Sequence, residues 1–265
     1  AFGQVQGAMS YFVDAYTTIA QWCSVVRRLD GFNRHVGEAL DLKSDLMIDN
    51  ASNITVGIEN VDVFLPNKNK DILIKDCTID LMKYQSLLIM GASGVGKSTL
   101  LRTLAGLWPY AKGNVYLPKE EEFLFLPQRP YLPLGSLRQA ISYPVVEEVI
   151  SEKYSDEEIK EILIACKLEN LADKLDIVDD WSRILSLGEQ QRIAFVRILL
   201  YRPEFVFLDE ATSALDEDLE GNLYDMLKIH LPNTKIISIA HRSSLIAKHQ
   251  AILRLKEKGC WEIHE

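Results

Sequence analysis

The sequence predicts an α/β fold with a mainly parallel core sheet, and three apolar runs of strand length carry that prediction. They cover residues 86–90, 205–208 and 235–240. The first ends in a glycine-rich turn, the second in Asp209-Glu210 and the third in His241. Ligands of open α/β sheets bind at the carboxyl ends of the strands. We therefore expect these three groups to meet at one edge of the sheet.

The turn after the first run reads Gly-Ala-Ser-Gly-Val-Gly-Lys-Ser over residues 91–98 and fits the pattern G-x-x-x-x-G-K-S. A helical pattern follows, with Leu100, Leu101, Leu104 and Leu107 on one face. The glycines allow consecutive N–H groups to turn toward one anion, and the helix N-terminus adds positive charge. Strand, loop and helix together predict the phosphate site of a P-loop NTPase.

Each polar group at this edge has an expected role toward a nucleotide. Lys97 is placed to reach the β- and γ-phosphates, and the Ser98 hydroxyl is placed to ligate Mg²⁺. Asp209 is expected to hold the Mg²⁺ shell, Glu210 to polarise the attacking water, and His241 to contact the γ-phosphate. The predicted nucleotide contacts in the loop are Gly91, Ser93, Gly94, Val95, Gly96, Lys97, Ser98 and Thr99.

A further motif lies between the loop and the Asp-Glu pair. Residues 185–192 read Leu-Ser-Leu-Gly-Glu-Gln-Gln-Arg and precede a strongly helical stretch. Here the chain resembles the ATP-binding domain of ABC transporters, whose signature reads Leu-Ser-Gly-Gly-Gln. Leu187 replaces the first glycine of that signature and Glu189 replaces its glutamine. Ser186 and Gly188, which the resemblance places against the γ-phosphate held by the opposite subunit, are both present.

Other elements of the resemblance follow in order and extend it over about residues 54–256. Gln128 resembles the Q-loop glutamine, residues 213–216 resemble the D-loop with its Asp216, and His241 resembles the switch histidine. The resemblance implies ATP and Mg²⁺ as the bound species, with Asp216 as a further nucleotide contact. It implies Lys97, Gln128, Glu210 and His241 as catalytic residues and Ser98, Gln128 and Asp209 around the metal.

Two phrases, at residues 104–109 and 125–138, are similar to one branch of this family. The branch joins bacterial transporters of the SbmA/BacA and YddA type with the fatty-acyl transporters of subfamily D. It implies a transmembrane domain on the same polypeptide and a second ATP-binding domain in a head-to-tail dimer. It further implies a location on the cytoplasmic face of a membrane, the bacterial inner membrane.

The adenine contact departs from the family pattern. Many relatives place a tyrosine before a proline upstream of the P-loop, where its ring stacks on the base. In this chain Leu65 stands before Pro66, with Phe64 beside it. Phe64 either substitutes for the tyrosine or belongs to the core.

Three domains are expected along the chain: a helical arm over residues 1–40, a polar linker over 41–53 and the ATP-binding domain over 54–265. In the arm, apolar residues recur at three- and four-residue steps and leave the other face polar. Three readings of this seam stay open: a cytoplasmic continuation of a membrane helix, as the resemblance implies, a coiled-coil dimer arm, or an amphipathic helix packed on its own domain. Since the chain begins Ala1-Phe2, it is expected to be part of a longer protein.

Within the ATP-binding domain two subdomains are expected. Alternating apolar residues over 54–58 and 61–63 predict short antiparallel strands, with a turn at 67–70. Residues from about 129 to 200 carry helix signals and form the predicted signature subdomain. Among these signals is a capping box of Ser155 and Glu158.

Composition restricts the functional classes. The net charge of −9 argues against a nucleic-acid partner, because phosphate neutralisation needs clustered lysines and arginines. The four cysteines are widely spaced and predict reduced thiols without a zinc site. Two rival functions stay open, a soluble ABC-type ATPase that moves no solute and an ATP-sensing regulatory module. Kinase and GTPase functions do not explain the signature motif.

Overall fold

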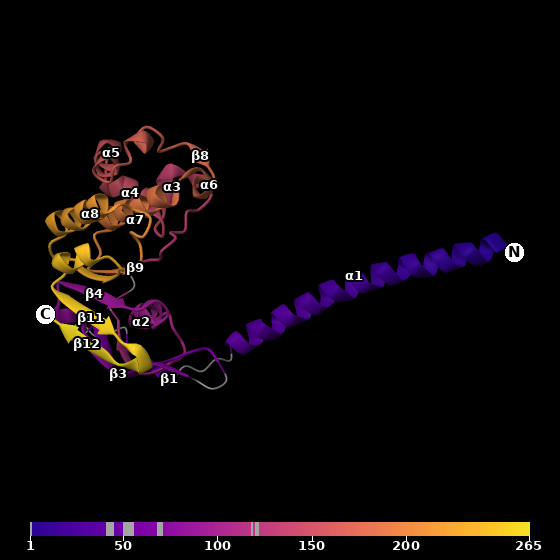
Figure 1. The fold of residues 1–265 in the computed structure, drawn as a ribbon. Helices are drawn as coiled ribbons and strands as arrows, with labels where there is room; N and C mark the ends of the chain where they lie inside the picture. Colours follow the sequence, from indigo (N-terminus) through magenta and orange to yellow (C-terminus); the bar gives the residue numbers. More distant parts are fainter. Residues whose placement is uncertain (1, 41–44, 50–55, 68–70, 118, 120–121) are drawn as a thin grey trace. The chain divides into compact units, whose positions relative to one another are not determined.

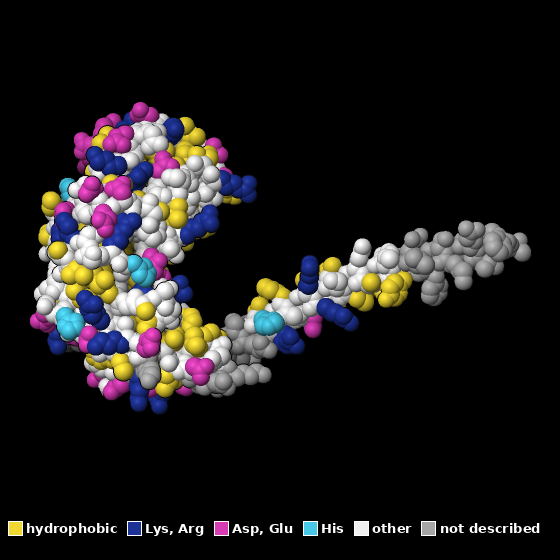
Figure 2. All heavy atoms as spheres, viewed as in Figure 1, with side chains coloured by type: hydrophobic (Ala, Val, Ile, Leu, Met, Phe, Trp, Pro, Cys, Tyr) yellow, Lys and Arg dark blue, Asp and Glu magenta, His cyan; other side chains and the backbone are white. Residues whose placement is uncertain are grey.

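The computed structural model describes residues 2–40, 45–49, 56–67, 71–117, 119 and 122–265. The chain divides into two units, residues 1–43 and 44–265. The described residues of the first unit form helix α1 (Phe2–Leu40), where a helical arm is predicted. Its described side chains include exposed apolar groups along the helix (Figure 2), among them Tyr16, Ile19, Trp22, Val26 and Phe32. Over the described residues, no helix combines the length and apolar character that crossing a bilayer requires.

The second unit is built on a six-stranded sheet of order β12-β11-β4-β10-β9-β6. The parallel strands are β4 (Ser86–Gly91), β6 (Phe123–Leu126), β9 (Phe205–Asp209), β10 (Lys235–Ile239) and β11 (Ala251–Leu255). Only β12 (Trp261–His264) pairs in the antiparallel direction, with β11. The predicted parallel core sheet is confirmed, and its three apolar runs occupy the adjacent strands β4, β10 and β9.

Both faces of this sheet are covered, which explains why its strands are apolar throughout. Alternate side chains point to two separate hydrophobic clusters. Leu88, Val206 and Ile236 belong to a cluster with the helices, whereas Leu87, Phe207 and Ile237 belong to a cluster with the smaller β subdomain. The sheet therefore forms the rigid centre from which the loops of the site project.

The β subdomain is a four-stranded sheet of order β1-β5-β2-β3. Its strands are β1 (Asp45–Asp49), β2 (Gly57–Phe64), β3 (Ile72–Asp80) and β5 (Ala111–Tyr116). Strand β2 is antiparallel to β3 and β5 with register shifts near residues 58–64, while β1 and β5 are parallel. The predicted antiparallel subdomain is thus present, with β2 as one irregular strand in place of two short ones.

The predicted linker over residues 41–53 is wrong for its central part. Residues 45–49 form β1, an edge strand anchored by the buried side chain of Leu46. Its sequence, Asp-Leu-Met-Ile-Asp, carries three consecutive apolar residues of which only Leu46 is buried, so the alternation that marks a half-buried strand is missing. The rest of the predicted linker, 41–44 and 50–53, lies outside the described residues. So do residues 68–70 of the predicted turn, which the Asn67 side chain flanks by donating to Asp71 at 2.8 Å.

Five helices form the predicted helical subdomain: α3 (Leu137–Ser142), α4 (Glu147–Lys153), α5 (Asp156–Ala165), α6 (Trp181–Ile184) and α7 (Leu187–Tyr201). The predicted capping box of Ser155 and Glu158 starts α5. Helix α7 runs beside α8 (Glu217–His230) and connects this subdomain to the sheet (Figure 1). The remaining α-helix, α2 (Lys97–Leu104), follows the glycine loop. The small β7 (Gly135–Ser136) and β8 (Val178–Asp179) pair with each other.

Candidate nucleotide site

The glycine loop joins the carboxyl end of β4 to the N-terminus of α2. Gly96 caps α2 with a φ of 103°, a left-handed conformation that a residue with a side chain rarely adopts. At Gly91 a Cβ atom would lie only 2.6 Å from the Leu255 carbonyl oxygen. Ser93 and Gly94 between them are exposed. The backbone of the loop is therefore constrained at Gly91 and Gly96, and the middle of the loop is open to solvent.

Lys97 is buried beneath this loop with only 5% of its surface exposed. Its ammonium group donates to the carbonyl oxygens of Gly91 at 3.0 Å and Ala92 at 2.9 Å. Desolvation lowers the pKa of Lys97, and the nearby carboxylates of Glu210 and Asp209 oppose that shift. An ammonium group has three donors, so one is left for a ligand in the loop.

A second contact joins α2 to the end of β9. The Ser98 hydroxyl donates to Asp209 at 2.6 Å, and the Arg102 guanidinium lies 3.4 Å from the other oxygen of this carboxylate. Asp209 is buried, whereas the Arg102 side chain is 46% exposed. The hydroxyl and carboxylate oxygens are ligands of the type that Mg²⁺ prefers, and Mg²⁺ usually completes its shell with substrate phosphates and water. The residues at this position fit that ion.

Glu210 and His241 meet where β9 and β10 end. The Nε2 atom of His241 lies 2.8 Å from Oε1 of Glu210, and both side chains are open to solvent. The Glu210 backbone N–H donates to Ile239 at 3.3 Å, and its φ of 52° is uncommon for a residue with a side chain. The structure therefore aims a carboxylate and an imidazole at each other beside Asp209 and Lys97.

Gln128 lies just after β6 and its side chain is exposed. Its backbone is hydrogen-bonded to the side chain of Gln191 in α7. The Gln191 amide donates to the Gln128 carbonyl oxygen at 2.9 Å and to the Ser213 hydroxyl at 3.1 Å. Its own oxygen accepts from the Ala214 N–H at 2.9 Å. Gln191 thus links three predicted motifs, a role that sequence reasoning missed. The sequence carries no clear signal for this role, because Gln191 stands between the polar residues Gln190 and Arg192.

We expect Gln191→Met to lower the free energy of unfolding by about 1–3 kcal/mol, because it leaves the Gln128 carbonyl and the Ala214 N–H without partners. Methionine has a similar shape, so packing changes little. Urea unfolding followed by far-UV circular dichroism measures the loss. Gln128→Met is the matched control, since the same replacement on an exposed side chain is expected to leave the unfolding midpoint unchanged. Equal midpoints for both variants would contradict the linking role.

Arg197, two turns further along α7, is buried and has main-chain partners in place of a carboxylate. Its guanidinium donates to the carbonyl oxygens of Tyr131 at 2.8 Å and Ala140 at 2.6 Å, and it lies 5.2 Å from the Tyr143 ring centre. Burial lowers the pKa of Arg197 to about 10, so the group stays charged at neutral pH. The segment that follows Gln128 is therefore attached to α7.

The signature residues lie at the N-terminus of α7. Ser186 caps this helix and is exposed, and Glu189 closes a capping box with it. Gly188 is held close to the 213–216 segment, because a Cβ there would lie 3.3 Å from the Ala214 carbonyl oxygen. Asp216 caps α8 by accepting from the Leu219 N–H at 2.8 Å.

A partly buried ion pair contacts the 213–216 segment. The Arg242 guanidinium lies 3.2 Å from Glu220 and donates to the Leu215 carbonyl oxygen at 2.5 Å. Glu220 also accepts from the Thr212 hydroxyl. Because Arg242 follows His241 directly, the segment is fixed to the same sheet edge.

Seven of the predicted site residues fall into two groups within the described part of the chain. At the sheet edge, hydrogen bonds join Ser98 to Asp209 and Glu210 to His241, and the charge of Lys97 lies near the Glu210 and Asp209 carboxylates. Ser186 and Gly188 form a separate group on α7, and no described contact joins them to the first group. Phe64 belongs to neither: its N–H donates to Tyr110 at 2.9 Å and its carbonyl accepts from Trp108 at 3.1 Å, contacts within and beside the β subdomain.

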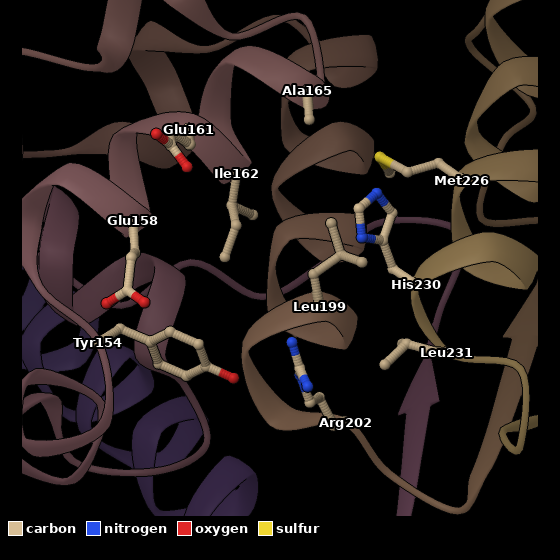
Figure 3. Close-up of a pocket in the computed structure, with 10 residues that line it drawn as sticks. All are labelled: Tyr154, Glu158, Glu161, Ile162, Ala165, Leu199, Arg202, Met226, His230 and Leu231. Atoms are coloured by element: carbon tan, nitrogen blue, oxygen red, sulfur yellow. The ribbon is translucent and has the colours of Figure 1, made fainter.

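A cavity of about 370 Å³ lies elsewhere, between α5, α7 and α8 (Figure 3). Apolar residues Ile162, Leu199 and Met226 line it, with Arg202 and His230 on one side and Glu161 on the other. None of the predicted site residues lines this cavity. It is therefore separate from the glycine loop and from the signature residues.

The fold and the sheet-edge site define an ATP-binding domain. The sequence profile of the ABC transporter family matches residues 74–213, and the chain belongs to this family. An uncharacterized ABC transporter ATP-binding protein of Haemophilus influenzae is 49% identical over 72% of the chain and 31% of its own length. The ATP-binding cassette sub-family D member 1 of Drosophila melanogaster is 36% identical over 82% of the chain and 30% of its length.

A similar fold occurs in the structure of a bacterial Atm1-family ABC exporter with ATP bound. It covers 80% of this chain and 39% of the exporter chain, with a TM-score of 0.65 and 24% sequence identity. The chain spans about a third of the length of the curated relatives it matches.

Proposed function

We propose that this chain is the ATP-hydrolysing domain of an ABC half-transporter that works as a dimer on the cytoplasmic face of a membrane. The observation that carries the proposal is the cluster of Lys97, Asp209, Glu210 and His241 beside the glycine loop. Membership in the ABC transporter family supports ATP as the ligand and transport as the purpose. A location at the bacterial inner membrane is supported by the similarity to the Haemophilus influenzae ABC transporter ATP-binding protein.

The loop and α2 bind the phosphates of ATP in this proposal. The loop N–H groups and the N-terminus of α2 surround the anion, and the free donor of Lys97 reaches the terminal phosphate. Ser98 and Asp209, with Gln128 from the next loop, would hold Mg²⁺, which when bound neutralises charge on the β- and γ-phosphates. The hydroxyl-to-carboxylate contact of 2.6 Å supports this role, because two oxygens at that separation can share one ion.

Glu210 is the proposed general base. Its carboxylate accepts a proton from the attacking water, while the His241 imidazole at 2.8 Å fixes the orientation of the carboxylate. His241 is half-exposed, so it can turn from Glu210 to the γ-phosphate. The backbone hydrogen bond from the Glu210 N–H to the Ile239 carbonyl oxygen joins the ends of β9 and β10, and so holds Glu210 close to His241.

The second subunit supplies the other half of the site. Ser186 is exposed at the N-terminus of the 15-residue helix α7, where aligned N–H groups attract phosphate. We infer that it contacts the ATP held by the partner's loop, so that two chains pair head to tail around two nucleotides. This arrangement would bring a phosphate to Ser186, whose hydroxyl has Glu189 as its described partner within its own chain.

In this proposal, the segment after Gln128 transmits the closing and opening of the dimer to the transmembrane domain. Tyr131 and Leu134 in that segment are 60% and 76% exposed, and Arg197 attaches the segment to α7. We infer that the transmembrane domain of the same polypeptide docks on these side chains. Closing and opening of the dimer would then move α7 and the docked membrane portion together.

Mixing two inactive variants tests the head-to-tail pairing. Lys97→Ala disables the phosphate loop, and Ser186→Arg blocks the signature position. In a head-to-tail mixed dimer, one site carries both defects and the other carries none. Turnover of an equal mixture should recover to roughly a quarter of the parental rate, since half of the randomly paired dimers are mixed and each keeps one intact site. Each variant alone is the control, and a mixture as inactive as its components would overturn the pairing.

A further inference from the structure

Glu189 takes part in every described contact that occupies the Ser186 hydroxyl. Its Oε2 atom accepts from the Ser186 hydroxyl at 2.8 Å and from the Ser186 N–H at 3.0 Å. The Glu189 N–H donates back to the hydroxyl oxygen at 3.3 Å. Asn170 donates to the second carboxylate oxygen at 3.2 Å. The only proton of the Ser186 hydroxyl is therefore directed at a carboxylate of its own helix.

This carboxylate is charged at neutral pH. Partial burial raises the pKa of Glu189, but the hydrogen bonds from Ser186 and Asn170, together with Arg192, outweigh burial and lower it below the usual value. A full negative charge thus lies within hydrogen-bond distance of the hydroxyl that is exposed to a partner.

We propose that Glu189 competes with the partner's γ-phosphate for the Ser186 hydroxyl and thereby weakens the ATP-bound dimer. The inference depends on the proposed function, because it takes Ser186 as a γ-phosphate ligand across the dimer. Two effects act in the same direction. The phosphate must displace a charged acceptor from the only proton of the hydroxyl, and the two anions repel each other across one shared donor.

A glutamine at position 189 removes both effects and leaves the helix start intact. Its amide has nearly the same shape as the carboxylate, and glutamine serves as well as glutamate in a capping box. The neutral amide oxygen is the weaker acceptor, so the Ser186 hydroxyl can turn to a phosphate. Glu189→Gln therefore removes the competing charge while it keeps the capping box that starts α7.

The test measures dimer dissociation of the 265-residue chain with ATP and Mg²⁺ by analytical ultracentrifugation. All proteins carry Glu210→Gln, which stops hydrolysis during the measurement. Adding Glu189→Gln is expected to lower the dimer dissociation constant by about tenfold, because a charge is removed beside both nucleotides of a symmetric dimer. Since exposed charges are screened by salt, the ratio between the two proteins should shrink toward one as NaCl is raised to about 1 M.

Glu161→Gln is the matched control, because it removes the same charge from α5, where the side chain lines the separate cavity. It should leave the dissociation constant unchanged. The competition is overturned if the Glu210→Gln protein dimerises with ATP but Glu189→Gln leaves the dimer dissociation constant equal or higher. It is also overturned if Glu161→Gln tightens the dimer as much as Glu189→Gln does. In both cases the proposed function stands. If ATP dimerises none of the proteins, the proposed function is overturned, and the inference with it.

Discussion

Replacing Glu210 with glutamine is expected to lower ATP turnover by about 10²–10⁴-fold while the variant still binds ATP and forms dimers. The amide has no basic oxygen to accept the proton of the attacking water. The groups that bind the nucleotide, Lys97, Ser98 and Asp209, are unchanged. Phosphate release measures turnover, and sedimentation with ATP measures the dimer that persists because hydrolysis no longer separates it.

Glu204→Gln is the control for this change. Glu204 is exposed just before β9, at the end of the strand opposite to Glu210, and the same replacement there should leave turnover at the parental rate. A Glu210→Gln protein that hydrolyses ATP as fast as its parent would show that another group is the base. Loss of the ATP-dependent dimer with retained ATP binding would contradict the role of hydrolysis in opening it.

Lys97→Ala is expected to weaken ATP binding by about a hundredfold, the cost of removing one partner from a buried, hydrogen-bonded charge pair. The phosphates lose their closest cation, and the Gly91 and Ala92 carbonyls lose the donor that holds the loop in shape. Isothermal titration calorimetry of ATP gives the dissociation constant directly.

The matched control is Lys112→Ala, which removes an exposed lysine from β5 in the neighbouring subdomain. It should bind ATP with the parental constant. Circular dichroism establishes that both variants are folded before binding is compared. A Lys97→Ala protein whose constant rises by less than about threefold would show that the loop backbone alone carries the phosphate affinity.

The fold was largely predictable because its main determinants are local. A glycine loop between an apolar run and a helical pattern specifies strand, turn and helix, and the apolar runs at 205–208 and 235–240 specify neighbouring strands. Strand β1 was not predictable, since one buried leucine among five residues gives no alternation. Its pairing with β5 depends on residues more than sixty positions away, which local pattern cannot reveal.

The first group of the site followed from the same logic, because the ends of adjacent parallel strands lie together. The structure brings Ser98 to Asp209 and Glu210 to His241, as their placement after strands implied. Their roles toward ATP stay predictions. Gln191 and Arg242 escaped sequence reasoning, since a buried polar side chain shows its purpose only when its partners from other segments are in place.

The buried guanidinium of Arg197 has a mechanical consequence. Its bonds to Tyr131 and Ala140 tie the exposed loop after Gln128 to the helix that begins at Ser186. Breaking them would leave an uncompensated charge in the interior, which is strongly destabilising. In the proposed function, the helical subdomain would therefore move as one rigid body between the nucleotide and the transmembrane domain. A displacement at the phosphate end would be transmitted with little loss.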